Sequence, residues 1–190
     1  MEPTSPSISF KLCKKAISLD EKQDIPHAVI GNIYLLNRKY DLAIEEGKRA
    51  IALNPNSAIG YVWLGQNLYY SGRPEEAIES IKKGMRLNPF PDTYYVLHLA
   101  AAYREAGRYE EAIAEYKRAL TLRPNNILAY LGFSLTYALA GRFEEAREAY
   151  SEVLKIDPKY SFEKGLKTYP FRPERIELFR AAMQKAGLAS

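Results

Sequence analysis

The sequence is poor in the residues on which metal binding, redox chemistry and acid–base catalysis most depend. Among its 190 residues there is one cysteine, Cys13, and there are two histidines, His27 and His98. A single cysteine excludes an internal disulfide and a zinc site made of several cysteines. The sequence also has no glycine-rich phosphate loop and neither the HExxH nor the GxSxG motif of hydrolases. We therefore expect no metal, no cofactor and no enzymatic activity.

Long apolar stretches are absent as well, and so are long stretches in which charges of one sign are concentrated. No uncharged apolar run approaches the roughly 18 residues that a membrane span requires, and residues 1–15 lack the basic-then-apolar order of a secretory signal. The net charge of +4 comes from 27 basic and 23 acidic residues interspersed along the chain, whereas nucleic-acid-binding proteins usually gather basic residues on one face. We therefore expect a cytoplasmic protein that neither enters a membrane nor binds nucleic acid.

What the sequence does contain is a repeat. Four segments close with an aliphatic residue, a polar residue and a proline, and the successive prolines are 34, 35 and 34 residues apart. These prolines are Pro55, Pro89, Pro124 and Pro158. A second landmark, Gly-Arg-X-Glu-Glu-Ala, starts at Gly72, Gly107 and Gly141, and a degenerate copy covers residues 38–43. Two landmarks that stay in step predict four consecutive structural units.

Small side chains recur at two places in every unit and indicate pairs of closely packed helices. The first set is Gly31, Gly65, Ala100 and Ser134, and the second set is Ala43, Ala77, Ala112 and Ala146. Larger aromatic residues would fill the space around each helix crossing. The glycine of each second landmark would end the first helix in a left-handed conformation. In the first unit Arg38 takes that place, and we expect its turn to be strained or loose.

Together these positions resemble the tetratricopeptide repeat (TPR) family, whose unit is a helix, a tight turn and a second helix. The resemblance implies an all-α fold, a right-handed α-solenoid of antiparallel helix pairs called the TPR superhelix. It divides residues 1–190, taken as a single domain, into a partial N-terminal repeat, four TPR units and a C-terminal capping helix. Their ranges are 8–23, 24–57, 58–91, 93–126, 127–160 and 173–187, respectively.

Several features narrow the resemblance to one subset of this family. An Asn-Pro-Phe-Pro segment and one inserted residue precede Tyr94, a Tyr-Pro-Phe segment covers 169–171, and Lys-Ala-Gly-Leu covers 185–188. In these features the sequence is similar to the C-terminal TPR tails of bacterial adenylate or guanylate cyclase-like proteins. No residues of a cyclase catalytic domain are present, so the resemblance implies no cyclase activity for this chain.

The two ends of the chain depart from the repeat. Residues 8–20 resemble the second helix of a unit whose first helix is missing, with Cys13 at an aromatic packing position. Residues 174–187 place four apolar side chains on one helical face, and Gly187 would end this helix. The helix would cap the flank of the fourth unit, lie in the groove as an internal ligand, or join two copies of the chain.

Solenoid geometry places the first helix of each unit on the concave face, where its non-packing positions would form a groove. The residues expected to line this groove are Ile25, Asn32, Leu35, Ile59, Val62, Gln66, Tyr69, Tyr94, Leu97, Arg104, Leu128, Leu131 and Leu135. This face is mostly apolar, which is unusual for a surface left to water. TPR domains that grip a C-terminal carboxylate carry lysine and asparagine at the fifth and ninth positions of a unit. Only Asn32 matches here, so we expect no such clamp.

Tyrosines that the repeat pattern does not require form a candidate interaction hot spot at the junction of the second and third units. They are Tyr69, Tyr70, Tyr94 and Tyr95. Phe90 precedes Tyr94 by four residues, and Arg104 takes a groove position in the same unit as Tyr94. Rigid aromatic residues near an arginine are typical of interaction hot spots. The alternative is that these residues pack the irregular junction.

The sequence therefore predicts a protein–protein interaction scaffold that binds a peptide or helix of a protein partner in an apolar concave groove. The family resemblance implies that it is the interaction or regulatory arm of a larger bacterial signalling protein. Two alternatives stay open. One is a homodimerisation module, and the other is an autoinhibited array whose C-terminal helix occupies the groove.

Overall fold

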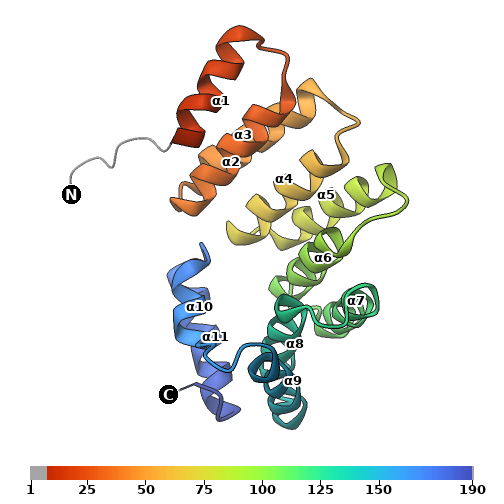
Figure 1. Cartoon of the computed structure of the whole chain (residues 1–190), viewed down its shortest axis with the longest axis vertical. Helices are drawn as coiled ribbons and strands as arrows, with labels where there is room; N and C mark the ends of the chain where they lie inside the picture. The colour runs from red at the N-terminus through yellow and green to blue at the C-terminus, as the bar shows by residue number, and fades with distance from the viewer. Residues whose placement is uncertain (1–7, 190) are drawn as a thin grey trace, which may run out of the picture.

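The computed structural model describes residues 8–189 (Figure 1). Residues 1–7 and Ser190 lie outside the described residues, and the segment compared with a secretory signal is described only from Ile8 onward. Within the described range the chain forms eleven helices and no strand. They are α1 Ile8–Leu19, α2 Asp24–Leu36, α3 Tyr40–Leu53, α4 Ala58–Tyr70, α5 Pro74–Leu87, α6 Thr93–Glu105, α7 Tyr109–Leu122, α8 Ile127–Leu139, α9 Phe143–Ile156, α10 Phe162–Thr168 and α11 Pro173–Lys185. This confirms the all-α fold class.

Four helix pairs, α2–α3, α4–α5, α6–α7 and α8–α9, stack in chain order into a curved array (Figure 1). The two helices of each pair pack on each other, and each second helix also contacts the first helix of the next pair. The first helices α2, α4, α6 and α8 contact one another in sequence and form the inner, concave side. Because no pair can cover its own apolar face alone, stacking creates the core.

Small residues at the helix crossings allow the close approach that the repeat pattern predicted. A Cβ atom on Gly65 would overlap Ile81 and would lie 3.0 Å from the carbonyl oxygen of Ala77. In the last pair the hydroxyl of Ser134 donates a hydrogen bond of 2.8 Å to the carbonyl oxygen of Ala146. The alanines that face these positions have no exposed surface, and they are Ala43, Ala77, Ala112 and Ala146. These side chains therefore fix the spacing of the two helices in each pair.

Each turn within a helix pair contains one residue in the left-handed conformation, at the first position of the Gly-Arg-X-Glu-Glu-Ala landmark, as expected. Gly72, Gly107 and Gly141 have φ angles of 87°, 75° and 76°. Arg38 occupies the same place in the first pair with a φ angle of 56°, and it is the only non-glycine residue with positive φ among the described residues. Since a left-handed conformation brings Cβ close to the backbone, the first turn is strained, which is one of the two outcomes expected from its sequence.

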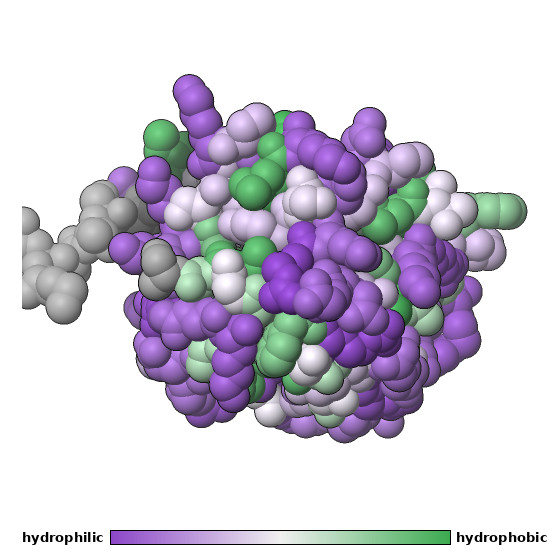
Figure 2. Space-filling view, turned by 90° about the horizontal axis from the view of Figure 1, so that it is seen from below, coloured by the Kyte–Doolittle hydropathy of each residue, from purple (hydrophilic) through white to green (hydrophobic). Residues whose placement is uncertain are grey.

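The arginine and glutamates of the landmark link neighbouring repeats on the surface. Arg108 pairs with Glu111 of its own repeat at 2.7 Å and with Glu75 of the preceding repeat at 3.5 Å. Arg142 makes the corresponding pairs one repeat later. These side chains are more than a third exposed, so water screens each pair and its contribution to stability is small. Seen from below, the molecule is mostly hydrophilic, with small separate hydrophobic patches (Figure 2).

The C-terminal tail, residues 161–189, does not continue the stack of long helix pairs. It consists of the short helix α10, an extended segment at 169–172 that we call the strap, and α11. Helix α11 packs against α8, and its Phe179 and Met183 are 0% and 1% exposed. Gly187, with a φ angle of 72°, ends this helix as predicted. The tail therefore belongs to the hydrophobic core.

At the other end, α1 packs mainly against α2. Its Cys13 is half-buried, and burial raises the pKa of the thiol above its ordinary value. This agrees with a packing role for Cys13. The outer face of α1 stays apolar and exposed, since Ile8, Leu12 and Leu19 are 79%, 61% and 77% exposed.

Replacing Arg38 by glycine should raise the free energy of unfolding by about 1 kcal/mol, because glycine adopts the left-handed conformation without the clash of Cβ. Urea denaturation followed by circular dichroism measures the change. Gly107→Ala is the matched control: its added methyl group meets no atom within 4 Å, so only the backbone cost, about 1 kcal/mol of lost stability, should appear. Lower or unchanged stability in Arg38→Gly would show that the first turn is not strained.

Candidate binding groove and the C-terminal strap

A pocket of about 570 Å³ lies on the concave face of the array. One wall comes from the first helices α2, α4, α6 and α8, and the other comes from α10 and the strap. The tail thus turns an open groove into a pocket with two sides. Its size is within the range of roughly 300–1,000 Å³ that is typical of ligand sites.

Most of the residues predicted to line the groove do lie on the pocket wall. They are Asn32, Leu35, Gln66, Tyr69, Tyr94, Leu97, Arg104, Leu128, Leu131 and Leu135. The pocket does not include Ile25, Ile59 or Val62. Val62 is fully buried because it faces Gly84 of the second helix of its own pair. Ile25 lies in the first turn of α2 and is 46% exposed.

The wall formed by the first helices has an open half and a covered half. Toward the starts of α6 and α8, Tyr94 and Leu128 are 37% and 48% exposed, and Leu97 and Leu131 are half-buried. Toward the end of each helix, the corresponding side chains are buried, and they are Leu35, Tyr69, Tyr70, Arg104 and Leu135. The strap lies over this second half. Only the open half can therefore be reached by a partner without movement of the tail.

The candidate hot spot is divided among three environments. Tyr70 is buried on the groove wall, where its ring lies 4.7 Å from the ring of Phe171 in the strap. Tyr95 is in the core, because it points about 100° around the helix from Tyr94. Phe90 is 89% exposed in the loop between α5 and α6. Of these three residues, Tyr70 lies on the wall of the pocket together with Tyr69, Tyr94 and Arg104, whereas Tyr95 and Phe90 do not.

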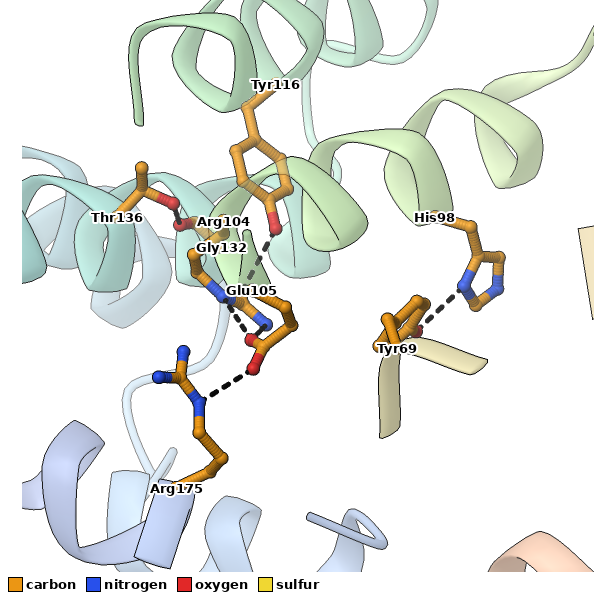
Figure 3. Close-up of polar contacts among 8 residues, drawn as sticks. All are labelled: Tyr69, His98, Arg104, Glu105, Tyr116, Gly132, Thr136 and Arg175. Carbon is orange, nitrogen blue, oxygen red and sulfur yellow. Dashed lines mark hydrogen bonds and ion pairs between the residues drawn. The ribbon is translucent and has the colours of Figure 1, made fainter. Parts of the chain in front are cut away.

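Tyr69 and His98 form a polar contact within the apolar pocket (Figure 3). The hydroxyl of Tyr69 lies 3.0 Å from Nδ1 of His98, and the ring of Tyr94 lies edge-on to the imidazole at a centroid distance of 4.2 Å. Burial lowers the pKa of His98 from its ordinary value to about 4. A neutral imidazole can accept a hydrogen bond from the Tyr69 hydroxyl at Nδ1, whereas a protonated imidazole cannot.

Arg104 is part of a buried ion-pair network and is not a free cation in the groove (Figure 3). It pairs with Glu105 at 3.1 Å and donates a hydrogen bond of 3.1 Å to the hydroxyl of Tyr116. Glu105 also pairs at 2.8 Å with Arg175 of α11. The guanidinium of Arg104 lies over the ring of Phe179 at 5.2 Å. The network therefore joins α6 and α7 to the tail.

The strap crosses from the fourth helix pair back to the first two. The hydroxyl of Tyr40 donates a hydrogen bond of 3.1 Å to the carbonyl oxygen of Pro170. Arg172 donates a hydrogen bond of 3.3 Å to the carbonyl oxygen of Ser71. Of the three arrangements considered for the C-terminal helix, the structure shows packing on the last pair, because α11 contacts α8. No residue of α11 lines the pocket, and the segment that occupies part of the concave face is the strap.

Several residues on the pocket wall are not among those predicted from the sequence. They are Trp63, His98, Tyr116, Tyr160, Phe162, Leu166, Tyr169 and Phe171. Tyr160 and Tyr169 could have been suspected from the sequence, because neither tyrosine fills a packing position of the repeat and each was therefore free for another role. The other tail residues could not be found from the repeat period, since the tail does not follow it.

Two further findings concern metals and membranes. Within residues 8–189, no three or more histidine, cysteine, aspartate or glutamate side chains are grouped so that they could hold a metal ion. In the same part of the chain, every helix is too short or too polar to cross a bilayer.

Acidification should destabilise the protein through His98. An unfolded histidine has a pKa of about 6.5, and the folded-state pKa is about 4, so between these values the unfolded chain binds the proton that the folded chain excludes. Lowering the pH from 7 to 5 should therefore reduce the free energy of unfolding by up to about 2 kcal/mol. In His98→Gln this part of the pH dependence should disappear from urea denaturation curves. An equal loss in both proteins would contradict a His98 that stays neutral in the folded chain at pH 5.

Glu105→Gln should lower the free energy of unfolding by about 3 kcal/mol, because it leaves Arg104 and Arg175 without their carboxylate. Chemical denaturation measures this loss. Glu111→Gln is the control, since it breaks an exposed ion pair with Arg108 and should cost much less, because water screens that pair. Similar losses in the two variants would mean that the network does not hold the tail.

The chain matches models of the tetratricopeptide repeat at residues 27–57, 58–91 and 92–159. Comparison with curated proteins finds no significant match. Among solved structures, the chain is similar to PilW, a widely conserved type IV pilus biogenesis factor, with a TM-score of 0.74 and 22% identity over 92% of this chain and 78% of PilW.

Two further solved structures resemble the chain to a comparable degree. YrrB, a TPR protein with an unusual peptide-binding site, has a TM-score of 0.61 and 22% identity, with 92% of this chain and 90% of YrrB covered. A TPR protein of Thermus thermophilus has a TM-score of 0.69 and 21% identity over 92% of this chain and 89% of its own. At these identities the likeness concerns the fold, the TPR superhelix. Since the repeat models also cover well over half of the sequence, the chain belongs to the tetratricopeptide repeat family.

Proposed function

We propose that this chain is a non-enzymatic, cytoplasmic scaffold that binds a peptide or helix of a protein partner on its concave face. The observation that carries the proposal is the open half of the pocket wall, where Tyr94, Leu97, Leu128 and Leu131 are apolar or aromatic and accessible. Apolar side chains gathered in a concavity are typical of binding sites, since leaving them to water is unfavourable.

Two kinds of comparison support this proposal. TPR proteins generally mediate protein–protein interactions, and the repeats match over most of the chain. YrrB, which shares the fold, is described as a TPR protein with an unusual peptide-binding site. A peptide laid on the open half here would meet leucine and aromatic side chains and would meet no unpaired charge from Arg104, because Glu105 neutralises it.

The place of the chain in a larger bacterial signalling protein is a further part of the proposal. It rests on the resemblance of the sequence to the C-terminal tails of adenylate or guanylate cyclase-like proteins. The coding sequence that adjoins Met1 in the parent gene tests it directly, because that arrangement puts a catalytic or receptor domain before the repeats.

Homodimerisation is a second candidate function, favoured by the exposed apolar face of α1. Ile8, Leu12 and Leu19 lie along one side of this helix and contact little else. In a solenoid such a face is normally covered by a neighbouring helix, and a second copy of the chain could cover it. Light scattering over a range of concentrations distinguishes a monomeric scaffold from a dimer.

The binding proposal predicts that a charge placed in the open half weakens peptide binding. Peptides selected from a random display library on the full chain provide the ligands, and fluorescence anisotropy measures their affinity. Leu128→Glu should weaken binding about tenfold or more, because it buries an unpaired carboxylate against the peptide. Leu154→Glu is the matched control, since Leu154 is similarly exposed but lies on the second helix α9.

Equal affinities in the two variants would place the bound peptide elsewhere than on the concave face. Melting temperatures of both variants accompany the measurement, because Leu128 and Leu154 are exposed to a similar extent and both variants should remain folded. A library that yields no peptide able to bind the folded wild-type chain would contradict the proposed function itself.

A further inference from the structure

The strap has the backbone conformation of a bound peptide. Tyr169 has φ and ψ angles of −87° and 142°, and Arg172 has angles of −67° and 147°. These values are close to the polyproline II conformation. Pro170 and Pro173 favour it, because each proline restricts its own φ angle and disfavours a helix at the residue before it. An extended, proline-containing segment of this kind is a recurrent form of peptide ligand.

The repeats, together with α11, hold the strap at three points. Phe171 is buried between the rings of Tyr70 and Phe179, at centroid distances of 4.7 Å and 4.9 Å. The carbonyl oxygen of Pro170 accepts a hydrogen bond from Tyr40. The guanidinium of Arg172 donates to the carbonyl oxygen of Ser71. An aromatic anchor, one main-chain acceptor and one cation are therefore recognised in a fixed order.

The strap is held less firmly than the helix that follows it. Helix α11 keeps Phe179 and Met183 fully buried, and Arg175 of this helix pairs with the buried carboxylate of Glu105. The strap buries Pro170 and Phe171, but Arg172 is exposed. The Arg175–Glu105 pair and the buried Met183 hold α11 without any contribution from the strap, so displacement of the strap would leave these contacts of α11 in place.

We propose that the concave groove recognises an extended aromatic–proline–aromatic–arginine segment of a partner protein, and that the strap holds this place until the partner displaces it. The inference rests on the proposed function and names the chemistry of its partner. A partner's aromatic side chain replaces Phe171 in the space between Tyr70 and Phe179. Its main chain accepts the hydrogen bond from Tyr40, and its arginine takes the place of Arg172.

The experiment uses the full chain and a fluorescein-labelled peptide with the sequence of residues 167–175. Phe171→Ala removes the anchor of the resident strap and leaves every residue that would contact the peptide unchanged. We expect this variant to bind the peptide about tenfold or more tightly than the wild-type chain, because the competent, strap-free state becomes more populated. Arg172→Ala, at an exposed position, should give a smaller gain. Lys167→Ala, on the exposed side of α10, is the control and should bind like the wild type.

A second peptide, with alanine in place of its phenylalanine, tests whether the groove recognises the peptide through this aromatic side chain. It should bind Phe171→Ala about tenfold more weakly than the first peptide does. Circular dichroism establishes that each variant is folded. Folded Phe171→Ala and Arg172→Ala proteins that bind the first peptide no better than the wild type overturn the inference, and so does equal binding of the two peptides.

The failure of this inference can be told apart from failure of the proposed function. Library peptides that bind the wild-type chain and Phe171→Ala equally well, and lose affinity in Leu128→Glu, would support the scaffold and overturn the role of the strap. A wild-type chain that is dimeric by light scattering, with the dimer lost in Phe171→Ala, would place a second copy's strap in the groove and would also overturn the inference.

Discussion

The close approach of two helices within each repeat is the constraint on which the rest of the structure depends. At Gly65 a single added carbon would collide with Ile81, and at Ser134 a hydroxyl ties the first helix to the backbone of the second. This spacing brings the first helices of successive repeats side by side, and their inner faces form one continuous wall. The tail then supplies the opposite wall. The pocket is thus a consequence of the repeat geometry and of a segment that lies outside the repeat.

Features of the fold that depend on local sequence could be predicted. Prolines and left-handed glycines mark where helices end, and small residues mark where helices cross, because each acts through its own backbone or its nearest neighbours. Arg38 is an instructive case. The absence of glycine at this place predicted strain, and the residue does adopt a positive φ angle. The position of Tyr94, Leu97 and Leu128 within their repeat units, combined with solenoid geometry, placed them on the inner face.

Features of the site that depend on distant parts of the chain could not be predicted. Arg104 has the right position for a groove residue, but Arg175, 71 positions later, helps to hold its carboxylate partner Glu105 below the surface. Val62 also has a groove position, but the absence of a side chain on Gly84 of the facing helix leaves room for Val62 to pack in the core. Periodicity reports which side of a helix a residue occupies, and it carries no information about a tail that folds back.

The strap also changes how the array as a whole responds to stress. In a linear solenoid each repeat touches only its neighbours, so the ends can unzip one unit at a time. Here hydrogen bonds join residues 130 and 101 positions apart, from Pro170 to Tyr40 and from Arg172 to Ser71. Such contacts raise the contact order and couple the first hairpin to the last. The ends of the solenoid are thus fastened to each other, and opening one of them disturbs the other.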